Sequence, residues 1–182
     1  AFLDQLEVGA SVSAPVLELM KLSFLGQINE NRREQGLHPV TRNLNPEAQR
    51  HAEDLRAFCY LSHWGRDGLK PYMRYTLAGG QTANAENIAG FKWCRANRQW
   101  LDLDDAVRKT HQGFMDSLGH RETILTPEFP MVSLGISWGD GHYCRVVQQF
   151  SEDPMVIGRR ILRMRAPSKT GLCQHRIPCQ QL

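Results

Sequence analysis

Apolar residues recur with helical spacing in the first third of the chain. Leu17, Met20, Phe24 and Ile28 follow one another at intervals of three and four residues, which is the pattern of an amphipathic helix. Pro15 suits the first turn of such a helix, so we expect it to run from there to near Gly36.

A second helix is predicted to start at Asn45-Pro46-Glu47, where a capping side chain, a first-turn proline and an acid follow one another. Its buried stripe is expected to be Ala48, Ala52, Leu55 and Cys59. His63 then falls one turn beyond this stripe on the interior side, just before Gly65. The remaining helices are expected over residues 69–77 and from Asp104 onward, the latter with the inner face Ala106, Thr110, Phe114 and Ser117 or Leu118.

The last regular pattern has a period of two. Val132, Leu134, Ile136 and Trp138 share one side of a predicted strand, and Gly139-Asp140-Gly141 turns the chain into a second strand over residues 142–150. Helices followed by an antiparallel hairpin predict an α+β domain in which helices pack over a mainly antiparallel sheet.

Charge divides the chain unequally. The net charge is +3, but the residues from Pro154 onward carry six basic side chains and no acidic one, so residues 1–153 carry 16 minus 19, or −3. We therefore divide the chain into an N-terminal leader (1–14), a domain (15–153) and a basic C-terminal arm (154–182). The arm is either a solvated tail or a contact for an acidic partner, anionic lipid or a negatively charged polymer. No feature predicts specific nucleic-acid binding.

The five cysteines form no CxxC pair, and their odd number leaves at least one thiol free or intermolecular. Cys173 and Cys179 are close enough to close a small loop, and Cys94 with Cys144 is the next pairing to test. No stretch approaches the ~20 apolar residues of a membrane span, so a transmembrane protein is not expected. Residues 1–4 lack the basic start of a secretory signal, so the protein is either cytosolic or already processed.

An ordered set of short motifs carries a family resemblance over about residues 16–150. The set consists of Ile28-Asn-Glu-Asn-Arg32, Gly36-Leu-His-Pro, Asn45-Pro-Glu-Ala, Ser62-His63, Asp67-Gly68, Ala85-Glu86-Asn87-Ile88, Ser117-Leu-Gly-His120-Arg121 and the strand Tyr143 to Phe150. It resembles the bacterial branch of the CAP superfamily, which comprises the cysteine-rich secretory proteins, antigen 5 and pathogenesis-related 1 proteins. Leu118 stands where the bacterial motif has proline, and Ser117 where eukaryotic relatives carry a second glutamate.

The resemblance implies a three-layer α-β-α sandwich in a secreted or cell-surface protein whose signal peptide has been removed. It also implies that His63, Glu86 and His120 meet in a central cleft. Gly141-His142-Tyr143 resembles a strand motif of the eukaryotic relatives, so His142 is a possible fourth cleft residue or else a core histidine. The other histidines, His38, His51, His111 and His175, are expected on the surface or on helix faces.

Two imidazoles and one carboxylate can hold a divalent metal, most readily zinc, with an open position for water. Without metal, Glu86 is the candidate base and His63 the candidate acid of a catalytic pair. The structural alternative is that His63 caps the second helix and Glu86 accepts hydrogen bonds from the backbone of a turn.

Three functions follow from these residues. The favoured one is an extracellular binding or interaction module for a protein or lipid partner, because no nucleophile with an activating partner is evident. A metal-dependent, peptidase-like hydrolase using the same cleft is the first alternative. A structural subunit of a surface assembly is the second.

Overall fold

The computed structural model describes residues 5–7, 12–81, 84–92, 100–138 and 143–152 of the 182-residue chain. The helices of this part are α1 (Ala14–Glu34), α2 (Glu47–Ala57), α3 (Pro71–Leu77), α4 (Leu103–Asp116) and α5 (Leu118–Leu125). The strands are β1 (Gln5–Glu7), β2 (Thr41–Arg42), β3 (Asn84–Lys92), β4 (Trp100–Asp102), β5 (Met131–Trp138) and β6 (Tyr143–Ser151).

The main sheet has the strand order β2-β5-β6-β3 and is mixed. The predicted hairpin is confirmed, since β5 and β6 are antiparallel with Trp138 opposite Cys144, and β6 and β3 are also antiparallel. The prediction of a mainly antiparallel sheet is only partly right, because β2 runs parallel to β5. A strand of two residues is too short to show a hydrophobic period, so the sequence gives no sign of this pairing.

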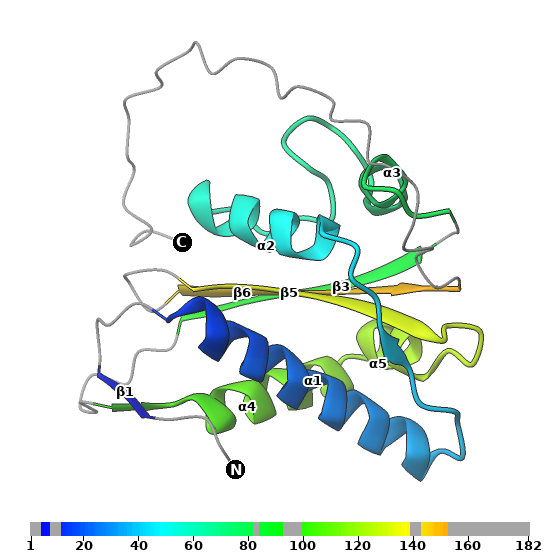
Figure 1. Ribbon diagram of the computed structural model, residues 1–182, viewed down its shortest axis with the longest axis horizontal. Helices are drawn as coiled ribbons and strands as arrows, with labels where there is room; N and C mark the ends of the chain where they lie inside the picture. Colours follow the sequence, from blue (N-terminus) through cyan, green and yellow to red (C-terminus); the bar gives the residue numbers. More distant parts are fainter. Residues whose placement is uncertain (1–4, 8–11, 82–83, 93–99, 139–142, 153–182) are drawn as a thin grey trace.

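Helices cover both faces of the main sheet (Figure 1), with α2 and α3 on one side and α1, α4 and α5 on the other. The apolar face of β5 packs in one core with the α1 stripe, as the pattern predicts. A smaller core lies under α2 and contains Ala48, Ala52, Leu55, Ile88 and Val147. Because six consecutive residues of β5 are buried, this strand is covered on both faces, as expected for the middle layer of three.

Local capping at the helix starts agrees with the sequence patterns. The Asn45 side chain accepts a hydrogen bond from the Glu47 amide at 2.9 Å, although α2 begins at Glu47 and Pro46, rather than Asn45, is its N-cap residue. Asp102 does the same for α4 by accepting from the Asp105 amide at 3.1 Å. Leu118, predicted as one possible inner residue of that helix, is 62% exposed because α4 ends at Asp116 and α5 begins a new direction at Leu118.

Two of the histidines expected on the surface or on helix faces lie on helices but are buried, so a surface position is wrong for both. His51 is 2% exposed and His111 is 5% exposed. Each occupies a position of its helix's buried stripe, since His51 lies three residues after Ala48 and His111 lies four residues after Val107. The helical period therefore indicated burial, and the polar residue type concealed it.

Burial makes His111 a test of acid stability. Its Nε2 donates to the Asn31 Oδ1 at 2.6 Å, while its buried Nδ1 has no partner among the described residues. Burial lowers the pKa of His111 from 6.5 to about 4, so stability that is present above pH 6.5 should be lost as the pH falls through about 4. We expect His111→Gln to reduce the loss of unfolding free energy between pH 7 and pH 4, as measured by urea unfolding. His38→Gln should not reduce this loss, because His38 is exposed. Equal acid sensitivity of wild type and His111→Gln would contradict this explanation.

The cysteine pairing expected second is also corrected. Cys144 is a free, buried thiol, so the Cys94–Cys144 pairing is wrong, whereas Cys59 is disulfide-bonded. The Cys173–Cys179 pairing and the basic arm fall outside the described residues. Within the expected leader, Gln5–Glu7 forms β1 and pairs with β4. None of the helices in the described ranges is long and apolar enough to cross a membrane.

Candidate functional site

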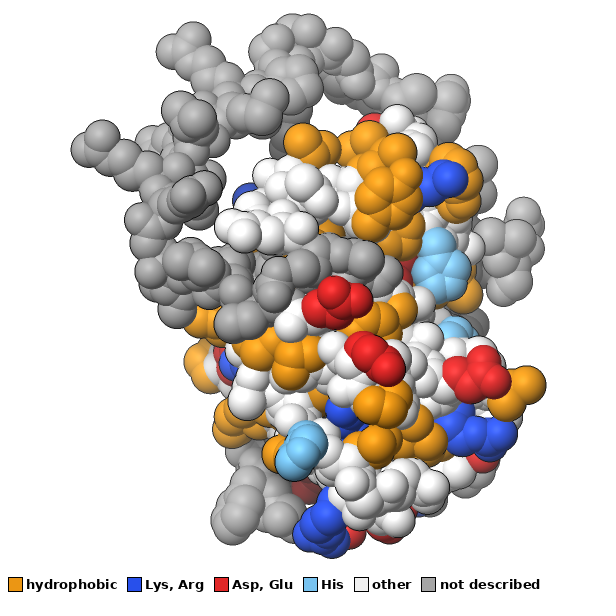
Figure 2. All heavy atoms as spheres, turned by 90° about the vertical axis from the view of Figure 1, so that its right-hand side faces the viewer, with side chains coloured by type: hydrophobic (Ala, Val, Ile, Leu, Met, Phe, Trp, Pro, Cys, Tyr) orange, Lys and Arg blue, Asp and Glu red, His pale blue; other side chains and the backbone are white. Residues whose placement is uncertain are grey.

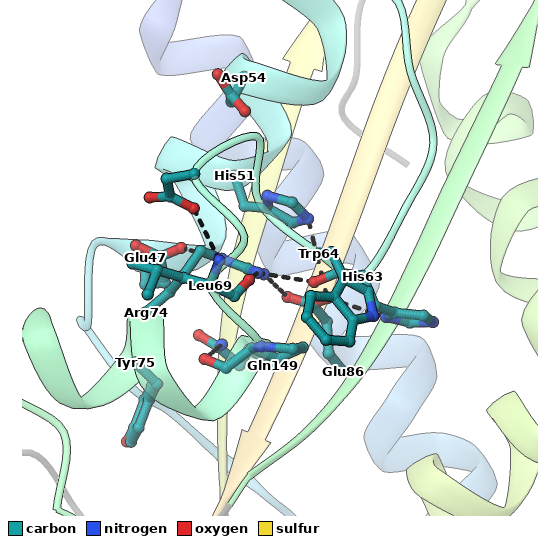
Figure 3. A network of polar contacts seen from close by, with 12 residues as sticks. Glu47, His51, Asp54, His63, Trp64, Leu69, Arg74, Tyr75, Glu86 and Gln149 are labelled. Carbon is teal, nitrogen blue, oxygen red and sulfur yellow. Dashed lines mark hydrogen bonds and ion pairs between the residues drawn. The ribbon is translucent and has the colours of Figure 1, made fainter.

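The side chain of Glu86 is the centre of a polar network between β3 and the α2–α3 connection (Figure 3). It is only 1% exposed, and its two oxygens have different partners. Oε1 lies 3.0 Å from the Nδ1 of His63, and Oε2 accepts a hydrogen bond of 2.7 Å from the Nη2 of Arg74. Since a carboxylate oxygen accepts, the proton of this His63 contact is on Nδ1. The predicted meeting of His63 and Glu86 is thus present in the structure.

Arg74 of α3 ties three parts of the chain together. Its Nε donates to the Glu47 Oε1 at 2.6 Å, so the guanidinium lies between two carboxylates. Its Nη1 donates to the main-chain oxygens of His63 at 2.7 Å and Leu69 at 3.0 Å. The guanidinium therefore fixes the loop between α2 and α3 at His63 and at Leu69, while the His63 side chain stays 47% exposed.

His51 adds a second anchor for the same loop. Its Nε2 donates to the Ser62 oxygen at 3.0 Å and lies 3.9 Å from the Glu86 Oε1. Burial lowers the pKa of His51, and the nearby charge of Glu86 only partly opposes this. Burial likewise raises the pKa of Glu47 against the opposing effect of Arg74. The network thus depends on Arg74 for the positive charge that compensates two buried carboxylates.

His120 approaches the same point of β3 from the other face of the sheet. Asn87, the neighbour of Glu86, donates from its Nδ2 to the His120 main-chain oxygen at 3.0 Å. The His120 ring packs edge-on against Phe114, with ring centroids 5.2 Å apart. Burial, and secondarily the charge of His63, lowers the pKa of His120. The two histidines therefore lie near enough to interact electrostatically, one on each side of the β3 edge.

At the predicted metal site, Glu86 is already paired with Arg74. Among the described residues no group of three or more His, Cys, Asp or Glu side chains could hold a metal ion. The guanidinium of Arg74 already supplies a positive charge to the Glu86 Oε2, and a dication there would be repelled by it. These residues do not fit a metal in this arrangement, and His142 lies outside the described residues. Zinc binding by His63, Glu86 and His120 stays a prediction from sequence.

Thermal unfolding with and without zinc tests that prediction. Because the Oε2 of Glu86 is already paired with Arg74, we expect saturating zinc to leave the Tm of the wild-type chain unchanged. A ligand at a hundredfold its Kd adds about 2.7 kcal/mol to stability, so real binding would be readily detected. A zinc-dependent rise in Tm that disappears in His63→Ala would establish the metal site and overturn this expectation.

Sequence reasoning missed the residues that hold this site together. Glu47 was interpreted only as an acid at a helix start, and Arg74 only as part of a short helix. Of these residues, only His51 could have been recognised from the sequence, because its position matches the buried stripe of α2. The ion pairs join residues 47, 74 and 86, and no local pattern predicts contacts over such separations.

Comparison with known proteins identifies similar sequences and folds. The profile of the "CAP: Cysteine-rich secretory protein family" matches residues 25–150. No curated protein sequence matches the chain. Among solved structures, an outer surface protein of Borrelia burgdorferi is similar with a TM-score of 0.62 and 17% identity, over 79% of this chain and 98% of that one.

Two further structures are similar to parts of longer proteins. An extracellular protein of Bacillus anthracis containing an SCP domain has a TM-score of 0.58 and 18% identity, over 79% of this chain and 45% of that one. A cysteine-rich secretory protein of Staphylococcus aureus has a TM-score of 0.54 and 16% identity, over 75% of this chain and 39% of that one. This chain thus spans less than half of either protein, and at these identities the likeness concerns the fold.

Proposed function

The chain belongs to the cysteine-rich secretory protein (CAP) family, and from that premise we propose that it is an extracellular binding module for a polypeptide partner. The names of the similar structures, an outer surface protein and an extracellular protein, support this location. The disulfide bond of Cys59 supports it as well, because disulfides persist in oxidising compartments outside the cytosol.

An exposed hydrophobic surface beside His63 carries the proposal. Of the ten large hydrophobic side chains exposed in the described ranges, six lie within the twenty residues from 58 to 77. We call them the loop–helix surface: Phe58, Leu61, Trp64, Tyr72, Met73 and Leu77. Figure 2 shows hydrophobic side chains gathered on this side of the molecule, with a histidine and a Lys or Arg side chain beside them. Large exposed apolar side chains concentrated in one short segment of the chain indicate an interaction site.

The charges around this surface indicate the chemistry of the partner. Arg66 lies over the Phe58 ring at 3.3 Å, and Lys70 lies 5.1 Å from the centre of the Trp64 ring. Asp67 is the one acidic residue between positions 58 and 77, and the charge of Arg74 is already compensated. A partner with apolar side chains and at least one acidic group would complement this surface.

A polypeptide partner suits the loop–helix surface better than a lipid bilayer does, because hydrogen bonds hold the loop of this surface in one conformation. Arg74 and His51 anchor the loop between α2 and α3 through three main-chain oxygens. Preorganised surfaces with tryptophan and tyrosine anchors are typical of protein recognition. The loop–helix surface also contains no long amphipathic helix of the sort that lies in a membrane interface.

The hydrolase alternative rests on the contact between His63 and Glu86. Their separation of 3.0 Å would suit an acid–base pair. However, the Glu86 carboxylate is 1% exposed and its second oxygen is paired with Arg74. Both oxygens of this carboxylate therefore already have partners inside the protein, His63 on Oε1 and Arg74 on Oε2, and neither is open to a substrate. This arrangement favours binding over hydrolysis.

A selection from a random twelve-residue peptide library, with the immobilised chain as the target, tests the proposed function. We expect enriched peptides to lose at least about tenfold in affinity for Trp64→Ser, equivalent to about 1.4 kcal/mol, because aromatic anchors dominate such interfaces. Leu22→Ser is the matched control, because Leu22 is 51% exposed on α1, on the opposite face of the sheet from the loop–helix surface. Peptides that bind Trp64→Ser as well as wild type, or no enrichment at all, would refute the proposal.

A further inference from the structure

Strand β3 lies at an edge of the main sheet and extends over nine residues. Its one strand partner among the described residues is β6. Apart from that ladder, no main-chain hydrogen bond of the described part involves residues 84–92. An edge strand with free N–H and C=O groups is a template for pairing with another extended chain.

At Glu86, the solvent-exposed surface of β3 is main chain rather than side chain. Residue Glu86 as a whole is partly exposed although its side chain is only 1% exposed, so the accessible surface belongs to its backbone. Ala85 and Ala89 are partly exposed and Gly90 is exposed. The backbone of β3 is therefore reachable directly beside the network of Arg74, and it offers hydrogen-bonding groups rather than a free carboxylate.

Exposed side chains flank this edge on both faces of the sheet. On the α2–α3 side, His63 contacts Glu86, and a Cβ placed on Gly90 would lie 3.1 Å from the Leu61 side chain. On the other side, Asn87 holds the start of α5, which carries His120 and the 62% exposed Leu118. A strand added at β3 would point alternate side chains toward these two sides.

We infer that the partner binds by strand addition: an extended polypeptide segment pairs with the outer edge of β3 between His63 and His120. Its apolar side chains on one face contact Leu61 and Trp64, and an acidic side chain on that face lies near Lys70. Alternate side chains contact Leu118 on the α5 side. This inference rests on the proposed function and adds the mode of binding and the class of partner.

Amide NMR with the peptides enriched from the random library tests the inference. We expect amides of β3 and of residues 61–64 to shift together, and some β3 amides to gain protection from hydrogen exchange on binding. N-methylation of the peptide at every second residue should weaken binding at least tenfold in one register and little in the other, because alternate N–H groups of an added strand face β3. Leu118→Ser should weaken binding, and Leu22→Ser should not.

The outcomes separate the mode of binding from the function. Shifts confined to residues 58–77, with both N-methylated registers binding equally, would overturn strand addition and leave the loop–helix surface as the binding site. Absence of any Trp64-dependent peptide would overturn both. Binding of the chain to phosphatidylglycerol vesicles through Trp64, with no peptide competing for it, would assign the surface to anionic lipid and also overturn the inference.

Discussion

Replacing Gly135 with alanine is expected to destabilise the chain by about 3 kcal/mol or more, because α2 packs directly on the backbone of β5. A Cβ at Gly135 would lie 1.9 Å from the main-chain oxygen of Ala48 and 2.6 Å from the amide nitrogen of Gln49. These are backbone atoms on the buried side of α2, so no side chain can rotate to make room. Urea unfolding of Gly135→Ala measures the loss.

Gly26→Ala is the matched control for that substitution. Gly26 lies inside α1, and a Cβ there would meet nothing within 4 Å. Alanine is favoured over glycine within a helix by about 0.5–1 kcal/mol, so this variant should be more stable than wild type. A Gly135→Ala chain as stable as wild type would show that the sheet and α2 are not packed as described.

Arg74→Met is expected to cost about 3–5 kcal/mol at neutral pH, because it leaves the carboxylates of Glu47 and Glu86 buried without a compensating charge. The loss should depend on pH in a defined direction. Burial raises the pKa of Glu47, and removing Arg74 removes a contact that lowers it. A group whose pKa is raised on folding contributes stability at low pH that is lost as the pH rises. The difference in unfolding free energy between wild type and Arg74→Met should therefore become smaller as the pH falls toward 4.5, the ordinary pKa of glutamate.

Two further variants test whether the loss of stability in Arg74→Met comes from its buried ion pairs. Adding Glu47→Gln and Glu86→Gln to Arg74→Met should restore part of the stability at neutral pH, because the buried charges are gone. Arg108→Met should cost less than about 0.5 kcal/mol, since Arg108 is 65% exposed and pairs with Asp105 on the helix surface. A cost for Arg74→Met as small as that for Arg108→Met, at every pH, would contradict the role given to the network.

Residues with a clear local period were predictable from sequence. The stripe Met20, Phe24 and Ile28 is buried, and the β5–β6 hairpin forms where alternation and the glycine turn predicted it. The burial of His51 was also encoded in the period of α2, but its polar side chain led to an assignment to the surface. Period was a better guide to burial than residue type in this helix.

Contacts between distant residues were predictable only through resemblance to a family. His63 and Glu86 were expected to meet on that basis, and they lie 3.0 Å apart. The role of Arg74 was not expected, because it depends on how α3 sits over β3. The parallel pairing of β2 was missed because two residues carry no pattern. Tertiary packing decides all three arrangements.

Mass spectrometry of a broad peptide library incubated with the folded chain, with and without added zinc, tests most directly whether the protein binds or cleaves. If it is a binding module in which Arg74 holds Glu86, the peptides should be recovered intact under both conditions while Trp64-dependent binders are retained on the chain. Cleavage that zinc restores and that Glu86→Gln abolishes, in a variant that still folds, would contradict this and establish a hydrolase.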